Sequence, residues 1–351
     1  MLNYADCGRS VMELSHRSKE YDQIHSAATD QLYTLLDIPR DDYAVLFLQG
    51  GATAHFAAVY LNLALYSEKP VDYCVSGIWS KKAAQEARDM GGSVNTIFSS
   101  SNGIPPRDQW SPFSPDPAYV FYVSNETVGG VEVDDNEMLD SFPAGVPVVC
   151  DMSSNILSRK IPVSRYGCIF AGAQKNIGPA GVTIVIIRRS LLRPESSAAQ
   201  TNRLIPSALD YTKMATANSL LNTPPTYAIY ISGLVFSDLL VNGGVEGAEA
   251  RADVKSRAVY EAIQRRSRIY SCPVVKRFQS RMNIPFRVVN AEGAVDEALE
   301  AAFLKEAEAR GMKGLKGHRS VGGIRASIYN AVPQESVDAL VQLMNDFMKD
   351  Q

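Results

Sequence analysis

Hydrophobic and polar positions alternate in blocks over the first two-thirds of the chain, where short apolar runs are separated by longer amphipathic stretches. Helices are expected at about residues 54–65 and 80–90, the second ending at Gly91-Gly92. Strands that alternate with helices are typical of an α/β fold with a mostly parallel sheet, which binds ligands at the carboxyl ends of its strands. The apolar runs predict buried strands at residues 44–48, 71–75, 119–123, 146–150, 168–171 and 183–187.

The last third of the chain predicts a smaller unit. Pro224-Pro225 opens an apolar helix that ends near Gly243-Gly244, and a long polar helix at about residues 246–266 follows. Strands near residues 274–278, 285–289 and 323–329 and helices at about residues 295–310 and 334–349 are expected after it. We therefore expect a large domain over residues 1–250 and a smaller α+β domain over residues 251–351.

Composition narrows the classes of function. The 351 residues are 46% hydrophobic and 21% charged with a net charge of −3, which is ordinary for a globular protein. Basic residues form no stripe, so we expect neither nucleic acid nor an anionic membrane as a partner. No apolar run approaches the roughly 20 residues of a membrane span.

The cysteines, the histidines and the N-terminal residues favour a cytoplasmic protein without a metal site. The five cysteines are scattered and form no CxxC pair, so they are expected to be reduced thiols. The four histidines have no paired His/Cys spacing, so no metal is expected. Residues 1–10 lack the charged-then-apolar pattern of a secretory signal.

The segment IFAGAQKNIGPAG at residues 169–181 is the most informative part of the chain. A single lysine, Lys175, follows a short strand of small residues and precedes further glycines and a proline. Tight packing of small residues can hold the amine partly out of water, which lowers its pKa and frees it to form a Schiff base. The plainer interpretation is a surface lysine in a Gly-Pro turn.

A turn of small residues, Gly50-Gly51-Ala52-Thr53, joins the first predicted strand to a helix. Small residues let backbone N–H groups approach a phosphate, and the start of a helix favours its negative charge. The turn matches neither GxGxxG nor the P-loop pattern, so a plain tight turn is the alternative.

Three further side chains come just after predicted strands. Asp151 could pair with the protonated ring nitrogen of pyridoxal phosphate, or it could cap the next turn with Ser153 and Ser154. Trp79 directly precedes a helix and could stack on a flat cofactor ring, or it could belong to the core. Thr127 could hydrogen-bond a ring substituent, or it could lie in an ordinary polar loop.

The interval between Asp151 and Lys175 leaves room for one crossover and one strand, so both side chains can reach one ring. With these residues in place, the chain resembles the phosphoserine aminotransferases, which are pyridoxal phosphate enzymes of the class V group with the aspartate-aminotransferase fold (fold type I). The stretches AGAQKNIGPAG and GHRSVGGIRASIYN are the longest and most specific. The similar stretches extend from near the start of the chain to near its end: residues 10–20, 50–56, 124–127, 151–159, 171–188, 222–227 and 317–330.

The resemblance implies a role for each residue around the cofactor, pyridoxal 5'-phosphate. Lys175 matches the lysine that forms the internal aldimine and shuttles a proton, Asp151 the partner of the ring nitrogen, and Trp79 the stacking ring. These three are the expected catalytic residues, and Thr127 matches a residue that bonds the ring oxygen. The cofactor phosphate is expected to contact Ala52, Thr53 and Gln174, and also Asn222 and Thr223 of the neighbouring subunit in a homodimer.

The resemblance also implies a basic substrate side. Arg325 matches the arginine that binds the substrate carboxylate, and arginine forks suit carboxylates and phosphates. His318 and Arg319, together with His16 and Arg17 donated by the partner chain, match the group around the substrate phosphate. Without the resemblance, each His-Arg pair would be interpreted as a surface pair.

The implied reaction is a reversible transamination in serine biosynthesis. L-glutamate and 3-phosphohydroxypyruvate would give 2-oxoglutarate and O-phospho-L-serine. The family has an extended segment ahead of its SVMELSHR-like stretch, and here that stretch begins at Ser10. A shortened form with reduced or no activity is therefore the alternative.

Other classes stay open on the sequence alone. A serine–glyoxylate-type aminotransferase or a cysteine desulfurase would share Lys175 and Asp151, although no cysteine follows the desulfurase pattern and two His-Arg pairs favour a phosphorylated substrate. A nucleotide-dependent oxidoreductase would need GxGxxG after its first strand, which residues 50–56 lack. A shortened, inactive relative that acts as a binding partner is the non-enzyme alternative. The short N-terminal part favours it, whereas the presence of Lys175, Asp151 and Trp79 argues against it.

Overall fold

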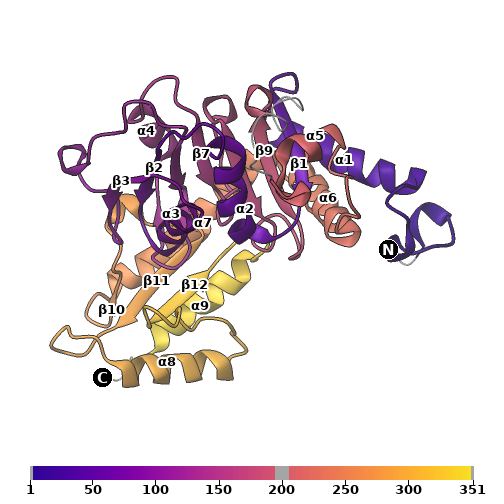
Figure 1. The fold of residues 1–351 in the computed structure, drawn as a ribbon. Coiled ribbons are helices and arrows are strands. Elements are labelled where there is room, and N and C mark those ends of the chain that lie inside the picture. The colour runs from indigo at the N-terminus through magenta and orange to yellow at the C-terminus, as the bar shows by residue number, and fades with distance from the viewer. Residues whose placement is uncertain (1–2, 194–204, 349–351) are drawn as a thin grey trace.

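The computed structural model describes residues 3–193 and 205–348, and the upper part of the molecule in Figure 1 is built on one large sheet. The spatial order of its strands is β1-β9-β8-β7-β4-β2-β3. Among them β9 runs antiparallel to both neighbours and the other pairs are parallel, which confirms the predicted mostly parallel sheet. The strands are β1 (Tyr43–Leu48), β2 (Val71–Val75), β3 (Val94–Ser99), β4 (Val120–Val123), β7 (Val148–Asp151), β8 (Cys168–Gly172) and β9 (Thr183–Arg188).

Helices cover both faces of this sheet. On β8, Ile169 and Ala171 join the core cluster under α1 and α6, whereas Cys168 and Phe170 join the cluster under α2 and α3. Because side chains alternate between two buried faces, the strands are apolar throughout and appear in the sequence as continuous runs. The helices are α1 (Lys19–Leu35), α2 (Gly51–Leu63), α3 (Ile78–Asp89), α4 (Asp135–Asp140), α5 (Tyr211–Thr216), α6 (Thr226–Val241), α7 (Gly244–Arg265), α8 (Glu297–Ala309) and α9 (Gln334–Asp346).

A smaller antiparallel sheet lies below the large one in Figure 1 and packs with α8 and α9. Helix α7 joins the two parts: Val245 and Ala248 belong to the main core, and Val259 and Ile263 belong to the core of the small sheet. The helix is continuous through residue 250, so the predicted domain boundary there stays a prediction. The remaining strands are β5 (Asn125–Glu126), β6 (Val131–Glu132), β10 (Tyr270–Ser271), β11 (Asn283–Val288) and β12 (Ile324–Ser327).

The strand predicted at residues 274–278 is wrong. The chain forms a 3-10 turn there, η8 (Lys276–Phe278), and β10 supplies the edge of the small sheet instead. Pro273 lacks the N–H that a sheet ladder requires. Val275 is 54% exposed whereas Phe278 turns into the main core, so the apolar residues here do not alternate across a sheet.

Helix α1 and strand β3 have no counterpart among the predicted elements. In α1 the buried stripe mixes Tyr21, His25 and Ala28 with only a few aliphatic residues, which weakens the apolar period. Strand β3 lies at the edge of the sheet and begins with three partly exposed residues. The predicted end of the last helix at residue 349 lies outside the described residues.

Within the described ranges, no single helix is long and apolar enough to cross a membrane; α6 and α7 meet that length and composition only as a pair bent by 83°.

The position of Val149 at the centre of the large sheet generates a stability prediction. Val149 is fully buried between Phe121 and Cys168 on the neighbouring strands. Val149→Ala should lower the free energy of unfolding by about 2 kcal/mol, because it removes two buried methyl groups and leaves a cavity. The same substitution at Val295, which is 46% exposed, is the matched control and should have little effect. Urea unfolding followed by circular dichroism measures both, and equal shifts would contradict the placement of Val149.

Candidate active site

A cavity of about 170 Å³ lies at the carboxyl ends of the central parallel strands. It gathers predicted residues from five separate segments, each of which follows a strand of the large sheet. The segments follow β1, β2, β4, β7 and β8. The lining residues are Gly51, Ala52, Thr53, Trp79, Val123, Asn125, Thr127, Asp151, Ser153, Ser154, Gln174 and Lys175.

The turn between β1 and α2 brings a helix N-terminus to this cavity. Gly50 adopts φ +94°, and a Cβ atom there would lie 2.4 Å from the Cβ of Ala54, so glycine is required on both counts. The first backbone N–H groups of α2 have no acceptor within the helix. Since Gly51, Ala52 and Thr53 line the cavity, these groups suit an anion such as a phosphate.

Lys175 is half-buried, and its Nζ atom donates a hydrogen bond to Oγ1 of Thr127 at 2.8 Å. The same nitrogen lies 5.8 Å from the centre of the Trp79 ring. Burial lowers the pKa of the amine; the negative charge of Asp151 opposes this and the positive charge of Arg325 adds to it. A lowered pKa increases the share of neutral amine, which is the form that reacts to give a Schiff base.

Asp151 ends β7 and is 4% exposed. Its Oδ1 atom accepts a hydrogen bond from the backbone N–H of Ser153 at 2.8 Å, so the interpretation as a turn cap is correct without excluding a role in the cavity. Burial raises its pKa, against the hydrogen bonds from Ser153 and the charge of Lys175. No basic side chain within the described residues forms an ion pair with this carboxylate.

Trp79 and Thr127 also line the cavity. The indole Nε1 of Trp79 is buried and has no hydrogen-bond partner in the described part of the chain. Thr127 is 7% exposed, with its hydroxyl turned toward Lys175. An aromatic face, a hydroxyl and an amine therefore surround one small space.

Arg325 reaches the edge of the site from β12. Its Nη1 atom donates to the backbone carbonyl of Thr127 at 3.3 Å, and its buried Nε atom has no partner among the described residues. His318 is half-buried beside Ser320, and Arg319 is exposed. These two side chains do not line the cavity.

The remaining predicted residues lie elsewhere in the single chain. His16 and Arg17 belong to the N-terminal segment before α1 and do not line the cavity. Asn222 and Thr223 are exposed, and the carbonyl of Thr223 accepts a hydrogen bond from Gln49 at 3.1 Å. Their predicted contributions across a subunit boundary stay predictions.

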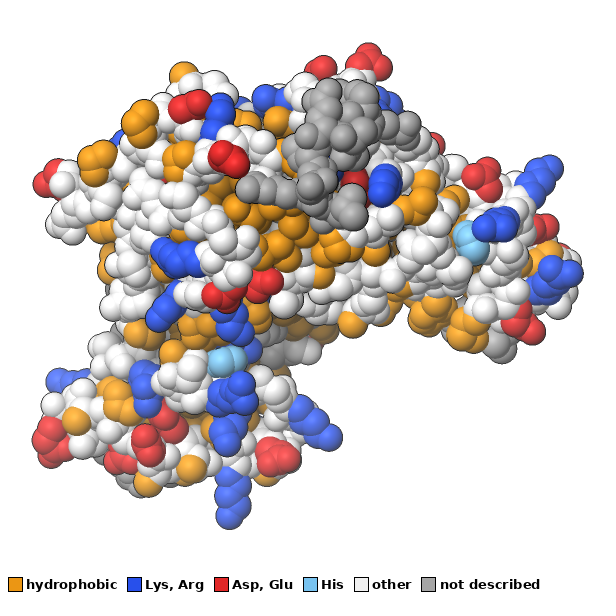
Figure 2. Space-filling view, viewed as in Figure 1, with side chains coloured by type: hydrophobic (Ala, Val, Ile, Leu, Met, Phe, Trp, Pro, Cys, Tyr) orange, Lys and Arg blue, Asp and Glu red, His pale blue; other side chains and the backbone are white. Residues whose placement is uncertain are grey.

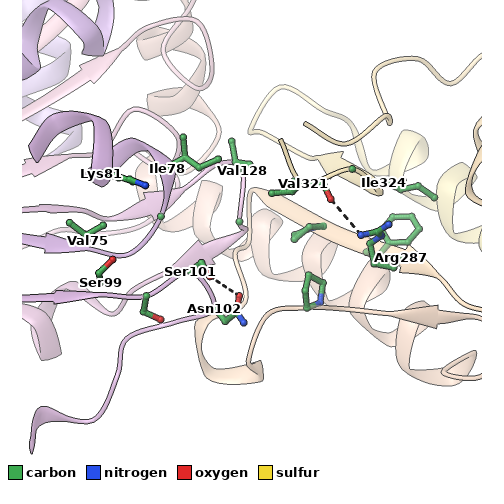
Figure 3. Close-up of a pocket in the computed structure, with 17 residues that line it drawn as sticks. Val75, Ile78, Lys81, Ser99, Ser101, Asn102, Val128, Arg287, Val321 and Ile324 are labelled. Carbon is green, nitrogen blue, oxygen red and sulfur yellow. Dashed lines mark hydrogen bonds between the residues drawn. The ribbon is translucent and has the colours of Figure 1, made fainter. Parts of the chain in front are cut away.

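A second cavity, of about 490 Å³, separates the large sheet from the small one beside the site. Figure 3 shows Ile78, Lys81 and Val128 on one wall, and Arg287 and Val321 on the other. Two segments, residues 77–79 and 127–129, form the wall between the two cavities. Trp79 and Thr127 line the smaller cavity, and the other residues of these segments line the larger one.

Several residues that line the cavity were not predicted to do so, among them Ser153, which was expected only to cap a turn. Asn125 donates hydrogen bonds to Ser154 and to Asn283 of β11, which ties the cavity wall to the small sheet. Ser153 accepts a hydrogen bond from the N–H of Gly172 at 3.0 Å, which ties it to the end of β8. Their position directly after strands was the available signal, but only the final contacts separate them from ordinary loop residues.

The residues present fit pyridoxal phosphate. A buried carboxylate without a cationic partner suits the protonated ring nitrogen, and an amine of lowered pKa suits the aldehyde. The start of α2 suits the phosphate, and the indole of Trp79 suits the ring face.

Known proteins are similar to this chain in sequence and fold over nearly its whole length. A family model for class-V aminotransferases matches residues 2–340. The phosphoserine aminotransferases of Laribacter hongkongensis and Drosophila melanogaster are 50% and 47% identical, covering 99% of this chain and 92% and 93% of their own lengths. The crystal structure of PLP-bound phosphoserine aminotransferase from Trichomonas vaginalis aligns with a TM-score of 0.89 at 39% identity, over 99% of this chain and 94% of that one.

These similarities confirm the aspartate-aminotransferase-like fold and pyridoxal phosphate as the cofactor. They decide against the desulfurase, glyoxylate and oxidoreductase interpretations, and they give no support to a form with reduced or no activity. The chain belongs to the phosphoserine aminotransferases, a family of pyridoxal phosphate-dependent class-V aminotransferases.

Proposed function

We propose that this chain transfers an amino group between L-glutamate and 3-phosphohydroxypyruvate, yielding 2-oxoglutarate and O-phospho-L-serine, in the serine biosynthesis of the cytoplasm. The observation that carries the proposal is the meeting of Lys175, Asp151 and the start of α2 in one cavity, with Arg325 at its edge. The membership of the chain in the phosphoserine aminotransferases supports the choice of substrates. Three fully buried free cysteines fit a reducing compartment.

Lys175 is proposed as the residue that moves protons. When bound, pyridoxal phosphate supplies an aldehyde that condenses with amines and a ring that withdraws electrons from the substrate's α-carbon. Nζ of Lys175 is held 2.8 Å from the Thr127 hydroxyl, and burial lowers the pKa of the amine. A neutral amine so placed can take the α-proton and return it on the same side of the site.

Asp151 and Trp79 are proposed to hold the ring in place. A buried carboxylate with a raised pKa gains most by pairing with a cation, so Asp151 would stabilise a protonated ring nitrogen. The Trp79 indole offers a flat apolar face in the lining of the same cavity. Ala52, Thr53 and Gln174 would hold the phosphate, with Thr127 near the ring oxygen.

Arg325 is proposed to bind the carboxylate common to both substrates. Its guanidinium already touches the carbonyl of Thr127, and its buried unpartnered Nε needs an acceptor. A bidentate carboxylate would supply one. His318 and Arg319, which lie in the loop before β12, would then contribute to the pocket for the substrate phosphate.

We also infer a homodimer with shared active sites. Helix α6 is apolar on nearly all sides, yet its last residue, Val241, is 83% exposed, and Leu234 and Leu240 are also exposed. A helix of this composition is normally buried. A groove of about 610 Å³ runs from α6 to Lys175, so a second chain on this face would lie next to the site.

The N-terminal segment supports the same inference. In Figure 1 it extends with α1 away from the body of the molecule, and Figure 2 shows hydrophobic side chains under the place where this arm joins the body. Met12 on the arm is 60% exposed. An arm of this kind could carry His16 and Arg17 to the site of the other subunit. Asn222 and Thr223, in the loop before α6, would reach that site separately.

The first prediction from the proposed function concerns Lys175. Lys175→Ala should retain bound cofactor without the Schiff base and lower kcat at least about a thousandfold, because no other side chain takes over the proton transfer. A coupled assay of 2-oxoglutarate formation measures the loss. Lys305→Ala, at an exposed lysine of α8, is the matched control and should retain full activity. Wild-type turnover in the Lys175 variant would refute its assigned role.

The second prediction concerns Arg325. Arg325→Met should raise KM for both L-glutamate and 3-phosphohydroxypyruvate, by about tenfold or more, since each loses a charged hydrogen bond. The substitution should also raise the pKa of the Lys175 amine, because the Arg325 charge lowers it. Cofactor association with the apoenzyme, followed across pH, should then slow near neutrality. Unchanged KM values for both substrates would remove Arg325 from the site.

The third prediction tests the shared site. Arg17→Ala and Lys175→Ala homodimers should each have strongly reduced activity. A hybrid dimer purified through two different affinity tags has one site with both residues intact, so it should recover roughly half of the wild-type activity. Hybrid dimers that form but recover no activity would show that Arg17 serves its own subunit or no site at all.

A further inference from the structure

Glu126 is a buried carboxylate that the proposed chemistry does not use. It lies in β5, is fully shielded from solvent, and pairs with no basic side chain among the described residues. Burial raises its pKa, and the hydrogen bonds that it accepts lower it. Burying a carboxylate costs free energy unless its hydrogen bonds compensate for the lost contacts with water.

The carboxylate caps helix α3 from a distant part of the chain. Oε2 accepts a hydrogen bond from the backbone N–H of Trp79 at 3.0 Å. Oε1 accepts from the N–H and the hydroxyl of Ser80 at 2.8 and 2.6 Å. The residue that precedes the helix, Gly77, has no side chain to cap it, so Glu126 satisfies N–H groups that would otherwise be orphaned at the positive end of the helix.

The close approach of Gly77 shows how tightly this carboxylate is held. A Cβ atom on Gly77 would lie 2.5 Å from Cδ and 2.6 Å from Oε2 of Glu126. The backbone of Gly77 is extended, with φ 173°, so its conformation alone would accept any residue. The absence of a side chain at residue 77 therefore serves the packing of Glu126.

Glu126 also connects two groups in the cofactor cavity. It holds the backbone of Trp79 directly, and its neighbour in the chain is Thr127, whose hydroxyl accepts the hydrogen bond from Lys175. The two segments that Glu126 joins, residues 77–79 and 127–129, form the wall between the two cavities. Figure 3 shows Ile78 and Val128 on the side that faces the larger cavity. A shift of the carboxylate would therefore move the indole and the hydroxyl relative to each other.

We propose that Glu126 is a positioning residue, which fixes the Trp79 indole and the Thr127 hydroxyl as one rigid wall against the cofactor ring by capping α3 across the chain. The inference rests on the proposed function, since it concerns the ring that Trp79 and Thr127 would contact. The competing explanation is that Glu126 merely stabilises α3. The two differ in one respect: a plain cap affects the stability of the apoprotein, whereas a positioning residue affects cofactor binding as well.

The test compares Glu126→Gln and Gly77→Ala with the wild-type enzyme. The glutamine amide turns an NH₂ group toward N–H donors, and the added methyl group at residue 77 displaces the carboxylate. Both variants should bind pyridoxal phosphate about tenfold more weakly or worse, as measured by titration of the apoenzyme. The visible band of the bound cofactor should also shift. Glu292→Gln, at an exposed carboxylate, is the matched control and should change neither the affinity for pyridoxal phosphate nor the visible band.

A double-mutant comparison isolates the contact itself. In a Glu126→Ala background the Gly77→Ala substitution has no carboxylate to displace, so it should weaken cofactor binding no further. Should Glu126→Gln fail to fold, Gly77→Ala decides the question alone, because Ser80→Ala would also remove the acceptor of the Ser76 and Gly77 N–H groups.

Two results would overturn the inference while leaving the proposed function intact. One is an active wild-type enzyme whose variants bind cofactor within twofold of it and show the same band. The other is a loss confined to the unfolding midpoint of the apoprotein. A wild-type protein that binds no cofactor and transfers no amino group would instead refute the proposed function itself.

Discussion

The parallel pairing of β7 with its two neighbours is the constraint on which the site depends. Asp151 pairs with Val123 at the end of β4 and with Phe170 near the end of β8. Because parallel strands in this register finish at the same level, the residues that follow them emerge at one edge of the sheet. Thr127, Asp151 and Lys175 therefore meet although 48 positions separate the first from the last.

Burial then gives these side chains their chemistry. It raises the pKa of Asp151 and lowers that of Lys175, while the attraction between the two groups opposes both shifts. The cavity thus holds a carboxylate and an amine whose charged forms are disfavoured by burial. A ligand with a cationic ring nitrogen and an aldehyde relieves both. The hydrogen bonds that Glu126 accepts lie in the same low-dielectric surroundings, which strengthen them.

Much of this arrangement could be predicted from the sequence. Both faces of the central strands are buried, so they stand out as continuous apolar runs, and Asp151 and Lys175 could be located at their ends. The strands of the small sheet were harder to predict. Strand β10 is only two residues long, and the apolar residues between Pro273 and Phe278 suggested a strand where the chain forms a 3-10 turn. Helix α1 buries a mixed stripe of aromatic and small residues, which has little periodic contrast.

The role of Glu126 could not be predicted from the sequence around it. Its partners, Trp79 and Ser80, precede it by more than forty positions, and nothing near Glu126 in the sequence indicates that it caps a helix. Residues expected to act across a subunit boundary, such as Arg17 and Asn222, raise the same difficulty, since their surroundings depend on a second chain. Sequence resemblance indicated them, whereas periodicity and spacing could not.

The most direct measurement is the visible spectrum of the purified enzyme with bound pyridoxal phosphate, recorded while L-glutamate and then 3-phosphohydroxypyruvate are added. We predict that glutamate removes the yellow band and that the phosphorylated keto acid restores it, because one site passes the amino group in both directions. A band that forms but responds to neither compound would contradict the proposal that this cavity carries out the transamination.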